Sequence, residues 1–378
     1  MANNNDKKVL NVPALRFPEF TEEWKEERLS KIAELSKGVG ISKEQLSEDG
    51  EPCILYGELY TKYKSEIIHK VISKTNIESS NLKRSKRNDV IIPCSGETAI
   101  DIAVARCVPF DNILLGGDLN IIRLHKDDGA FMAYQLNGKR KIDIAKLAQG
   151  VSVVHLYGEN IKAIKTYNPC LQEQQKIVKL LSMLDERIEV QNKIIEKLET
   201  LIKGIVETVI SSQKPNTLIK NCLECNSSTL QESQVAETGT FPVYGATDIS
   251  GYTETAGING ESILIIKDGS GVGTVKFVSG EYSYIGTLNS LTAKDGYCLK
   301  YIYFALQRFS FEPYKTGMAI PHIYFKDYGK AKIYCPSFSL QTLIAQKLSL
   351  IENKMEMEKR IILCYQLQKS YLLSRMFI

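Results

Sequence analysis

The stretch KDGSGVGTVKF, residues 267–277, is the most glycine-rich segment of the chain and could bind a phosphate. A kinase-type glycine loop needs a third glycine where Thr274 stands, and a P-loop needs Gly-Lys-Ser/Thr where Gly273 precedes Thr274 and Val275. Backbone amides in a glycine turn can still bind any phosphate, including one on a nucleic-acid strand. Taken alone, the segment fits a plain hairpin turn and an anion-contacting loop equally well.

The cysteines and histidines do not indicate a metal site. Cys222 and Cys225 have metal-ligand spacing, but no second pair follows at zinc-ribbon distance, so we expect two buried or free thiols. Nine cysteines at irregular spacings favour a reducing cytoplasm over a disulfide framework. No apolar run is long enough to span a bilayer, and MANNNDKKVL lacks the apolar core of a signal peptide. The sequence therefore predicts a cytoplasmic protein with no metal and no membrane span. The histidines, which also lack metal spacing, are His69, His125, His155 and His322.

The charge is unevenly distributed, although the net charge is only +4. The segment 61–87 contains eight basic residues and only two acidic ones, Glu66 and Glu78. Tyrosines interleave with lysines in YGELYTKYK, residues 56–64. A solvated surface can carry such charge, but aromatic residues within a basic segment favour contact with nucleic acid. The basic residues are Lys62, Lys64, Lys70, Lys74, Lys83, Arg84, Lys86 and Arg87.

The chain contains two copies of one unit. An offset of 167 residues aligns GVSVVHLYGENIKAIKTYNPCLQEQQKIVKLLS, from Gly150, with GMAIPHIYFKDYGKAKIYCPSFSLQTLIAQKLS, from Gly317. Upstream, DVIIPCSGETA aligns with SILIIKDGSGV, so that Gly96 matches Gly269. Because the first copy keeps only one glycine there, we interpret the two segments as equivalent loops acting on different ligand sequences, not as ATP loops. Matched pairs include Gly150/Gly317, His155/His322, Tyr157/Tyr324, Pro169/Pro336, Gln174/Gln341, Ile177/Ile344 and Leu181/Leu348.

Each copy ends in a long helical segment. Residues 171–211 contain no proline, and 41 residues at 1.5 Å each predict a helix of roughly 60 Å. Apolar residues recur at alternating spacings of four and three, as in a coiled coil, with Gln191 as the one interruption; Glu358 and Lys369 interrupt the second helix. Antiparallel pairing would bring Gln191 and Glu358 together. The alternative is that both helices are core elements of a globular domain. The first seam is Ile177, Leu181, Leu184, Ile188, Ile195, Leu198, Ile202, Ile205 and Val209; the second is Ile344, Leu348, Ile351, Met355, Ile362, Tyr365, Leu372 and Met376.

A second apolar stripe on the last helix is left uncovered by such a pair. Its members recur every seven residues, which predicts that helices of a partner chain bind there. The predicted partner-binding residues are Leu350, Met357, Cys364 and Tyr371.

These patterns predict an α+β protein with two similar α/β domains joined by two long helices in an antiparallel coiled coil, with an internal pseudo-two-fold repeat. We place an N-terminal tail at 1–23, the first domain at 24–169 and the first helix at 170–212. The second domain then covers 213–336 and the second helix 337–378. Two modules on a rigid rod suit two separated sites on a long ligand, for which DNA is the natural candidate.

The whole chain resembles the specificity subunit of type I restriction–modification systems. The segments that carry the resemblance are LRFPEFTEEWKEERLSKIAEL, FPVYGATDISGYTE and NPCLQEQQKIVKLL, in the order domain, helix, domain, helix. The resemblance implies two target-recognition domains that read a bipartite DNA sequence, with the helices setting the distance between half-sites. It also implies binding to two methyltransferase subunits, which modify adenine with S-adenosylmethionine, and to restriction subunits in the full complex.

The chain itself is expected to be non-catalytic and to hold no cofactor. The adenine-methyltransferase signature Asn/Asp-Pro-Pro-Tyr/Phe is missing; the nearest match is Asn168-Pro169-Cys170. Two alternatives stay open: a coiled-coil scaffold that binds only proteins, and a self-contained DNA methyltransferase.

The predicted DNA contacts lie on loops that can reach base edges in the major groove, with lysine and arginine on phosphates. For nearby carboxylates such as Glu58 and Asp248, we expect a loop-ordering role. In the first domain the predicted contacts are Tyr56, Gly57, Tyr60, Lys62, Tyr63, Lys64, Lys83, Arg84, Lys86, Arg87, Ser95, Gly96 and Thr98. In the second they are Tyr244, Gly245, Thr247, Ser250, Lys267, Gly269, Ser270, Gly271 and Gly273.

Overall fold

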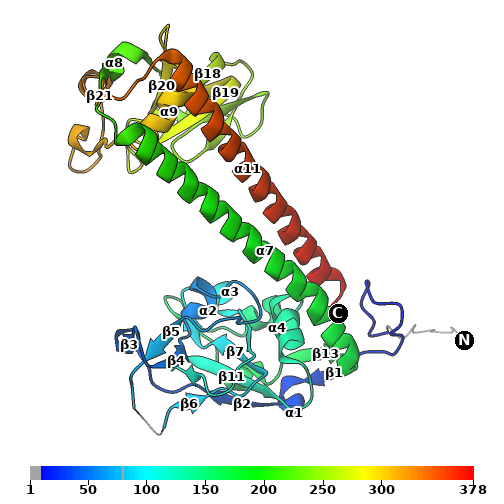
Figure 1. The fold of residues 1–378 in the computed structure, drawn as a ribbon. Helices are drawn as coiled ribbons and strands as arrows, with labels where there is room; N and C mark the ends of the chain where they lie inside the picture. The colour runs from blue at the N-terminus through cyan, green and yellow to red at the C-terminus, as the bar shows by residue number, and fades with distance from the viewer. Residues whose placement is uncertain (1–9, 79–80) are drawn as a thin grey trace, which may run out of the picture. The chain divides into compact units, whose positions relative to one another are not determined.

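The structure, a computed structural model, describes residues 10–78 and 81–378 (Figure 1). The chain forms two compact units. One runs to Asn192 and includes Ile361–Ile378, and the other is Lys193–Arg360. Both units mix strands and helices, and two long helices join them, which confirms the predicted α+β class and repeat architecture.

The first unit contains two sheets and two strand pairs. The four-stranded sheet has the order β2-β11-β7-β9, and its pairs are antiparallel. The five-stranded sheet has the order β3-β5-β4-β10-β6. Two further pairs of short strands, β1-β13 and β8-β12, belong to this unit. Its elements are β1 (Lys25–Arg28), α1 (Leu29–Ile32), β2 (Ala33–Lys37), η1 (Lys43–Gln45), β3 (Leu46–Ser47), β4 (Glu51–Ile54), α2 (Glu58–Thr61), β5 (Ser73–Thr75), β6 (Lys83–Arg84), β7 (Asp89–Pro93), β8 (Ser95–Gly96), α3 (Ala99–Ile102), β9 (Arg106–Val108), β10 (Leu114–Leu115), β11 (Leu119–Leu124), α4 (Gly129–Asn137), α5 (Lys141–Lys146), β12 (Val154–His155), α6 (Gly158–Ile161) and β13 (Lys165–Asn168).

The second unit repeats this plan with one larger sheet, in the order β15-β20-β18-β19-β16-β17. The antiparallel run β15-β20-β18-β19 corresponds to β2-β11-β7-β9, and the pair β14-β21 to β1-β13. Helix α9 packs on β18 and β19 as α4 packs on β7 and β9 (Figure 1). Its elements are β14 (Thr217–Leu218), α8 (Ile219–Cys222), β15 (Leu223–Ser227), η3 (Glu232–Gln234), β16 (Phe241–Tyr244), β17 (Ile249–Thr253), β18 (Ile258–Ile266), β19 (Val275–Tyr284), β20 (Leu288–Ala293), α9 (Leu299–Gln307), η4 (Glu312–Tyr314), α10 (Phe325–Tyr328) and β21 (Lys332–Ile333).

The long helices are α7 (Leu171–Val206), which continues into a π-helical turn η2 (Glu207–Ser211), and α11 (Phe338–Arg375). Within the first unit, Ile177 and Leu181 of α7 pack in one cluster with Leu372 of α11 and with Met376, which directly follows α11. Within the second, Val206 of α7 shares a core with residues of α11. The helices therefore run antiparallel in each unit, and the predicted seam positions lie on their packed faces.

One seam residue is predicted wrongly. Val209 is 37% exposed, whereas Val206 and Ile210 are buried. The π-helical turn at Glu207–Ser211 takes more residues per turn than an α-helix, so it rotates the buried face by one position. A heptad pattern cannot reveal such a turn, because the pattern assumes an uninterrupted α-helix.

A matched pair of glutamines attaches each long helix to its domain. Gln174 is buried; its Oε1 accepts from the Asp128 amide at 2.8 Å and its Nε2 donates to the Pro169 carbonyl at 3.0 Å. Gln341 makes the equivalent bonds in the second unit: its Oε1 accepts from the Cys298 amide at 3.0 Å, and its Nε2 donates to the Pro336 carbonyl at 2.9 Å. Asp128 and Cys298 are the N-caps of α4 and α9. The repeated glutamine thus satisfies an amide at the helix start that would otherwise lack a partner.

The seam lysine of α11 belongs to a buried charged cluster of the first unit. Lys369 Nζ lies 2.5 Å from a carboxylate oxygen of Glu66 and 2.5 Å from one of Asp185. The Tyr134 hydroxyl donates to Asp185 at 2.6 Å, and burial followed by the Asp185 charge raises the pKa of Tyr134. Both carboxylates are more than 90% buried, and Lys369 is their ion-pair partner. The buried guanidinium of Arg106 contributes a second positive charge that interacts with both carboxylates. The expected meeting of Gln191 with Glu358 stays a prediction.

Candidate nucleic-acid interface

In the first domain, a buried carboxylate orders the tyrosine-rich loop. Glu58 accepts from the Leu55 amide at 3.1 Å, from Lys62 Nζ at 2.7 Å, and from the Ser73 hydroxyl. This confirms the loop-ordering role expected for Glu58. It also means that the Lys62 ammonium is already bound within the protein, while Lys64 is exposed.

Two of the predicted segments meet in this domain. Tyr56, Gly57 and Tyr60 are half-buried, and a Cβ on Gly96 would lie 4.0 Å from the Tyr60 hydroxyl. Burial raises the pKa of Tyr60, with smaller contributions from Tyr56 and from carboxylates in and beside the Ser95–Thr98 segment. Thr98 is exposed and caps α3 by accepting from the Asp101 amide at 3.2 Å.

Two predicted contacts, Tyr63 and Ser95, are core residues instead. Tyr63 is 6% exposed, its hydroxyl accepts from the Ile72 amide at 3.2 Å, and burial raises its pKa to about 12. Ser95 is 6% exposed and pairs with His155 between β8 and β12. Neither side chain can reach DNA in this conformation. Sequence alone could not separate Tyr63 from its neighbours, because every tyrosine in the loop suits a stacking role equally.

The Lys83–Arg87 cluster lies elsewhere. Its strand β6 is on the opposite side of the first unit from α2 and α3 (Figure 1). Arg84 forms a bidentate ion pair with Glu51 at 2.6 and 3.0 Å, which raises the pKa of Arg84 and lowers that of Glu51. Lys83 is half-buried, whereas Lys86 and Arg87 are exposed. The structure therefore does not combine this cluster with the tyrosine loop into one surface.

In the second domain, the turn between β16 and β17 is fixed by its own contacts. The Gly245 amide donates to the Asp248 carbonyl at 2.7 Å, and a Cβ on Gly245 would collide with the Ser250 hydroxyl at 1.9 Å. Lys276 binds the Asp248 carboxylate, which lowers the pKa of Asp248, and lies 4.7 Å from the Tyr244 ring centroid. Thr247 is exposed and Ser250 half-buried, so Thr247 presents the freer side chain.

The glycine-rich stretch is the loop of the β18–β19 hairpin. Its amides largely serve the protein itself: Lys267 donates to the Thr287 carbonyl at 3.0 Å, Gly269 to Pro321 at 3.0 Å and Gly273 to Ile266 at 2.9 Å. Gly269 and Gly273 have φ of 99° and 92°, and a Cβ on Gly273 would lie 2.9 Å from Phe311. Gly269 and Gly273 are therefore needed for the turn and for packing. The exposed residues of the loop are Ser270 and Thr274. Gly271 and Lys267 are half-buried.

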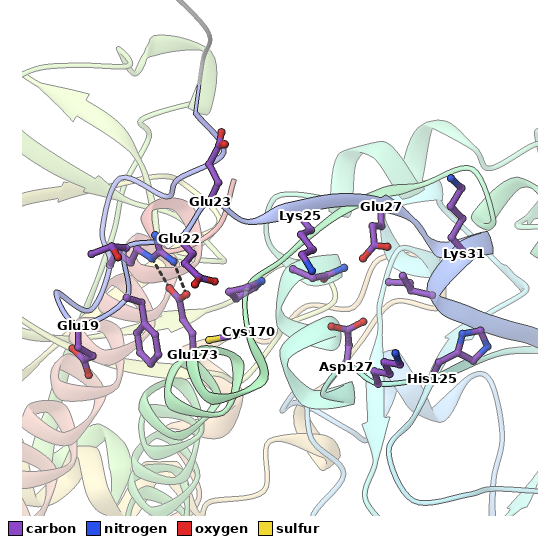
Figure 2. A pocket seen from close by; sticks show the side chains of 17 residues that line it. Glu19, Glu22, Glu23, Lys25, Glu27, Lys31, His125, Asp127, Cys170 and Glu173 are labelled. Carbon is purple, nitrogen blue, oxygen red and sulfur yellow. Dashed lines mark hydrogen bonds and ion pairs between the residues drawn. The ribbon is translucent and has the colours of Figure 1, made fainter.

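A pocket of about 700 Å³ lies in the first unit between the N-terminal segment and the start of α7 (Figure 2). In this pocket the Arg16 guanidinium donates two hydrogen bonds to the Glu173 carboxylate, each 2.7 Å long and drawn as a dashed line in Figure 2. The carboxylates lining the pocket outnumber its lysines and arginines, which disfavours a phosphate ligand. None of the predicted DNA contacts lines it. The carboxylates are Glu19, Glu22, Glu23, Glu27, Asp127 and Glu173, and the cations Arg16, Lys25, Lys31 and Lys126.

The thiols and histidines do not form a metal centre within residues 10–78 and 81–378, where no group of three or more metal-ligating side chains occurs. Cys222 is buried and Cys225 half-buried, and both are free. Among the same residues, no helix is long and apolar enough to cross a bilayer.

The partner-binding residues predicted on α11 are all exposed, with exposed fractions of 63% for Leu350 and 57% for both Met357 and Tyr371.

Sequence reasoning missed one feature that both domains share. The loops before His155 and His322 expose Val151 and Met318 almost completely, and each histidine pairs with a predicted recognition segment. The sequence repeat could have revealed these equivalent loops, because it already aligns Gly150 with Gly317 and His155 with His322.

Comparison with known proteins gives a consistent result. The family model described as type I restriction modification DNA specificity domain matches residues 21–200 and again residues 221–363. The structure is similar to that of a type I restriction–modification system S subunit from M. genitalium, with a TM-score of 0.70, 19% identity, and coverage of 97% of this chain and 99% of that one. A chain from a structure described for complex assembly and conformational transition of the type I R-M system gives a TM-score of 0.53 at 14% identity, covering 94% of this chain and 97% of the other.

Proposed function

Because the chain belongs to the family of type I restriction–modification DNA specificity domains, we propose that it is the DNA-recognition subunit of such a system and that each domain reads one half of a bipartite target. The observation that carries the proposal is the domain repeat. Both domains keep the same four-stranded antiparallel run and the same glutamine anchor, whereas the loops at the candidate interface differ in sequence. A conserved frame with different loops suits two readers of different sequences.

Base reading would come from exposed or half-buried loop side chains at the candidate interface. In this proposal the base-reading residues are Tyr56, Tyr60 and Thr98 in the first domain, and Thr247 and Ser270 in the second. Their exposure, partial for the two tyrosines, would leave them accessible to base edges in the groove. Lys64 and Lys267 would bind phosphates and set the register of the protein on the duplex. Lys86 and Arg87 follow β6, on the opposite side of the first unit from α2 and α3, so they would bind phosphate only on DNA that extends beyond the base-reading loops. The ion-paired Lys62 and Arg84 would contribute only if DNA displaced Glu58 and Glu51.

We further propose that catalysis belongs to partner subunits. Two methyltransferase subunits would modify adenine with S-adenosylmethionine, and restriction subunits would join in the full complex. One structural neighbour is described for complex assembly of the type I R-M system, and the exposed apolar residues of α11 offer a surface for such partners here. The chain would supply recognition alone.

The test is a methylation map of the source genome, which would reveal a bipartite motif. We expect Lys267→Ala with Ser270→Ala to change or weaken recognition of one half-site only, because both residues lie on one hairpin of the second domain. A matched variant, Lys220→Ala with Ser228→Ala, also removes a lysine and a serine side chain in that domain and should leave the motif unchanged. A motif altered equally in both halves by the first variant, or a methylome without any bipartite motif, would contradict the proposal.

A further inference from the structure

Two equivalent loops expose apolar side chains to an unusual degree. Val151 is 99% exposed and Met318, its match in the repeat, 106%. Two positions further on, Val153 is 52% and Ile320 62% exposed. Single exposed apolar residues are common on protein surfaces. An exposed pair at the same positions of both domains indicates a shared function.

Both loops hold the same conformation. Gly150 and Gly317 have φ of 122° and 88°, and a Cβ there would lie 2.1 Å from the Val153 carbonyl oxygen or 2.3 Å from that of Ile320. Two backbone hydrogen bonds close each loop, at 2.7 and 2.9 Å between Gln149 and His155, and at 2.8 and 2.9 Å between Thr316 and His322. The apolar side chains therefore project from fixed turns, which lowers the entropy cost of using them in binding.

Each turn is attached to a predicted recognition loop. His155 pairs with Ser95 and Val154 with Gly96, while His322 pairs with Asp268. The Gly269 amide of the glycine-rich loop donates to the Pro321 carbonyl at 3.0 Å. Each turn is therefore held directly beside a predicted recognition loop.

An aromatic residue and a lysine accompany each turn. Tyr157 and Tyr324 are both 47% exposed, and their rings lie 6.3 and 5.9 Å from the rings of His155 and His322. Lys37 Nζ lies 6.0 Å from the Tyr157 ring centroid, and Lys326 Nζ 5.2 Å from that of Tyr324. Apolar, aromatic and cationic groups on one surface are the groups that pack on bases and bind phosphates.

We propose that these two turns are paired DNA clamps that contact the duplex independently of its sequence. Val151 with Val153, and Met318 with Ile320, pack against or between base steps, while Lys37 and Lys326 bind the neighbouring phosphates. This inference rests on the proposed function. It assigns sequence-independent DNA contact to the turns, whereas the proposed function assigns base reading to the recognition loops. Reading two half-sites requires loops that differ, whereas a feature kept in both domains suits a contact that both half-sites share. Because the two turns pair with the predicted recognition loops, DNA is favoured over a protein as the partner that binds to them.

The test measures binding of the full-length chain to two fluorescent duplexes, one carrying the motif mapped by methylation and one with that motif scrambled. We expect Val151→Ser with Val153→Ser, and separately Met318→Ser with Ile320→Ser, to weaken binding to both duplexes by roughly tenfold or more, because each loses the burial of two apolar side chains. The ratio between the duplexes and the slope against salt should not change, since no charge is removed. Ile142→Ser, at a residue of α5 that is 55% exposed, is the control and should bind as the unmodified chain does.

A second readout reports insertion directly. With 2-aminopurine placed along the half-sites, fluorescence should rise where a base step is opened by the unmodified chain, and the rise should be lost in the turn variants. Turn variants that bind both duplexes normally would overturn the inference. So would a loss confined to the motif duplex, which would make the turns base readers, or a loss of methyltransferase assembly with normal DNA affinity. If the unmodified chain does not prefer the motif duplex, the proposed function itself fails, and this inference with it.

Discussion

At the scale of single residues, Lys369 has a role that its position in an apolar seam conceals. Its ammonium is the counter-charge of Glu66 and Asp185, which come from a loop of the first domain and from α7. The side chain thus joins three segments far apart in the sequence. Burying the lysine ammonium costs desolvation energy. Removing it alone costs more, because Glu66 and Asp185 would stay buried without an ion-pair partner, with only the charge of the nearby Arg106.

We therefore expect Lys369→Met to destabilise the first unit by about 3–5 kcal/mol. The chain's one tryptophan, Trp24, is buried in one cluster with Leu372 of α11 and with Met376, so its fluorescence reports urea unfolding of this unit. The control within the same unit is Lys162→Met, whose ammonium pairs with Glu159 at the surface, and which should change stability by less than about 0.5 kcal/mol. Equal urea midpoints for the two variants would show that the cluster does not stabilise the unit.

Residue roles were the least predictable level from sequence. The repeat pointed to Gln174 and Gln341 as a matched pair, but only the structure shows that each caps a domain helix. Tyr63 and Ser95 were predicted as DNA contacts and are buried, because composition marks a loop as aromatic and basic without telling which side chains turn inward. The basic segment likewise divides into two separate places, since strand pairing sends β6 away from α2.

At the scale of elements, the helices followed from periodicity almost completely. The spacing of four and three predicted the packed faces of α7 and α11, and it failed only at the π-helical turn. The strands were predicted as mixed β runs, but their order was not, because the pairing of residues far apart leaves no local pattern. The exposed stripe on α11 was also predictable, since it recurs every seven residues beside a seam already accounted for.

That stripe gives the prediction for this level. Met357→Lys with Tyr371→Lys should abolish binding of methyltransferase subunits while leaving the fold of both domains unchanged, because both side chains are 57% exposed and a charge there costs the free chain little. Co-purification of the tagged chain with its methyltransferase, together with circular dichroism, measures both effects. Asn353→Lys with Gln366→Lys adds the same charges at exposed positions of α11 outside the stripe and should bind normally. Loss of binding in both pairs would point to total charge as the cause.

At the scale of the whole molecule, the continuous helices are the elements that could set the gap between half-sites. The sequence alone predicts that lengthening the junction near Ser211–Pro215 by a few residues widens that gap, because this junction connects the first helix to the second domain. The structure of the second unit argues against that route. Val206 and Ile210 on one side of the junction, and Ile344 and Leu348 of α11, pack in the same core as the sheet residues of the domain. Extra residues at the junction would bulge out of this core and leave the domain where it is on its helices.

The sharper experiment extends both helices together. Seven residues inserted after Asn192 in α7, with seven more after Arg360 in α11, fall where the two units divide and leave the packing inside each unit intact. Seven residues complete two coiled-coil turns, so each helix keeps its packed face and grows by about 10 Å. At 3.4 Å per base pair, we expect methylation mapping to find a gap wider by up to about three base pairs, with both half-site sequences unchanged.

The two one-sided changes are the matched controls for this variant. Seven residues in α7 alone, or in the 212–216 junction alone, should leave the gap as it is. The first should also destabilise the chain, because the second unit packs both helices against one core and only one of them has grown. An unchanged gap in the doubly extended variant would show that the helices do not set the spacing. A gap that widens equally with the junction insertion would show instead that the domain is free to move on its helices, against the shared core that Val206, Ile344 and Leu348 form with it.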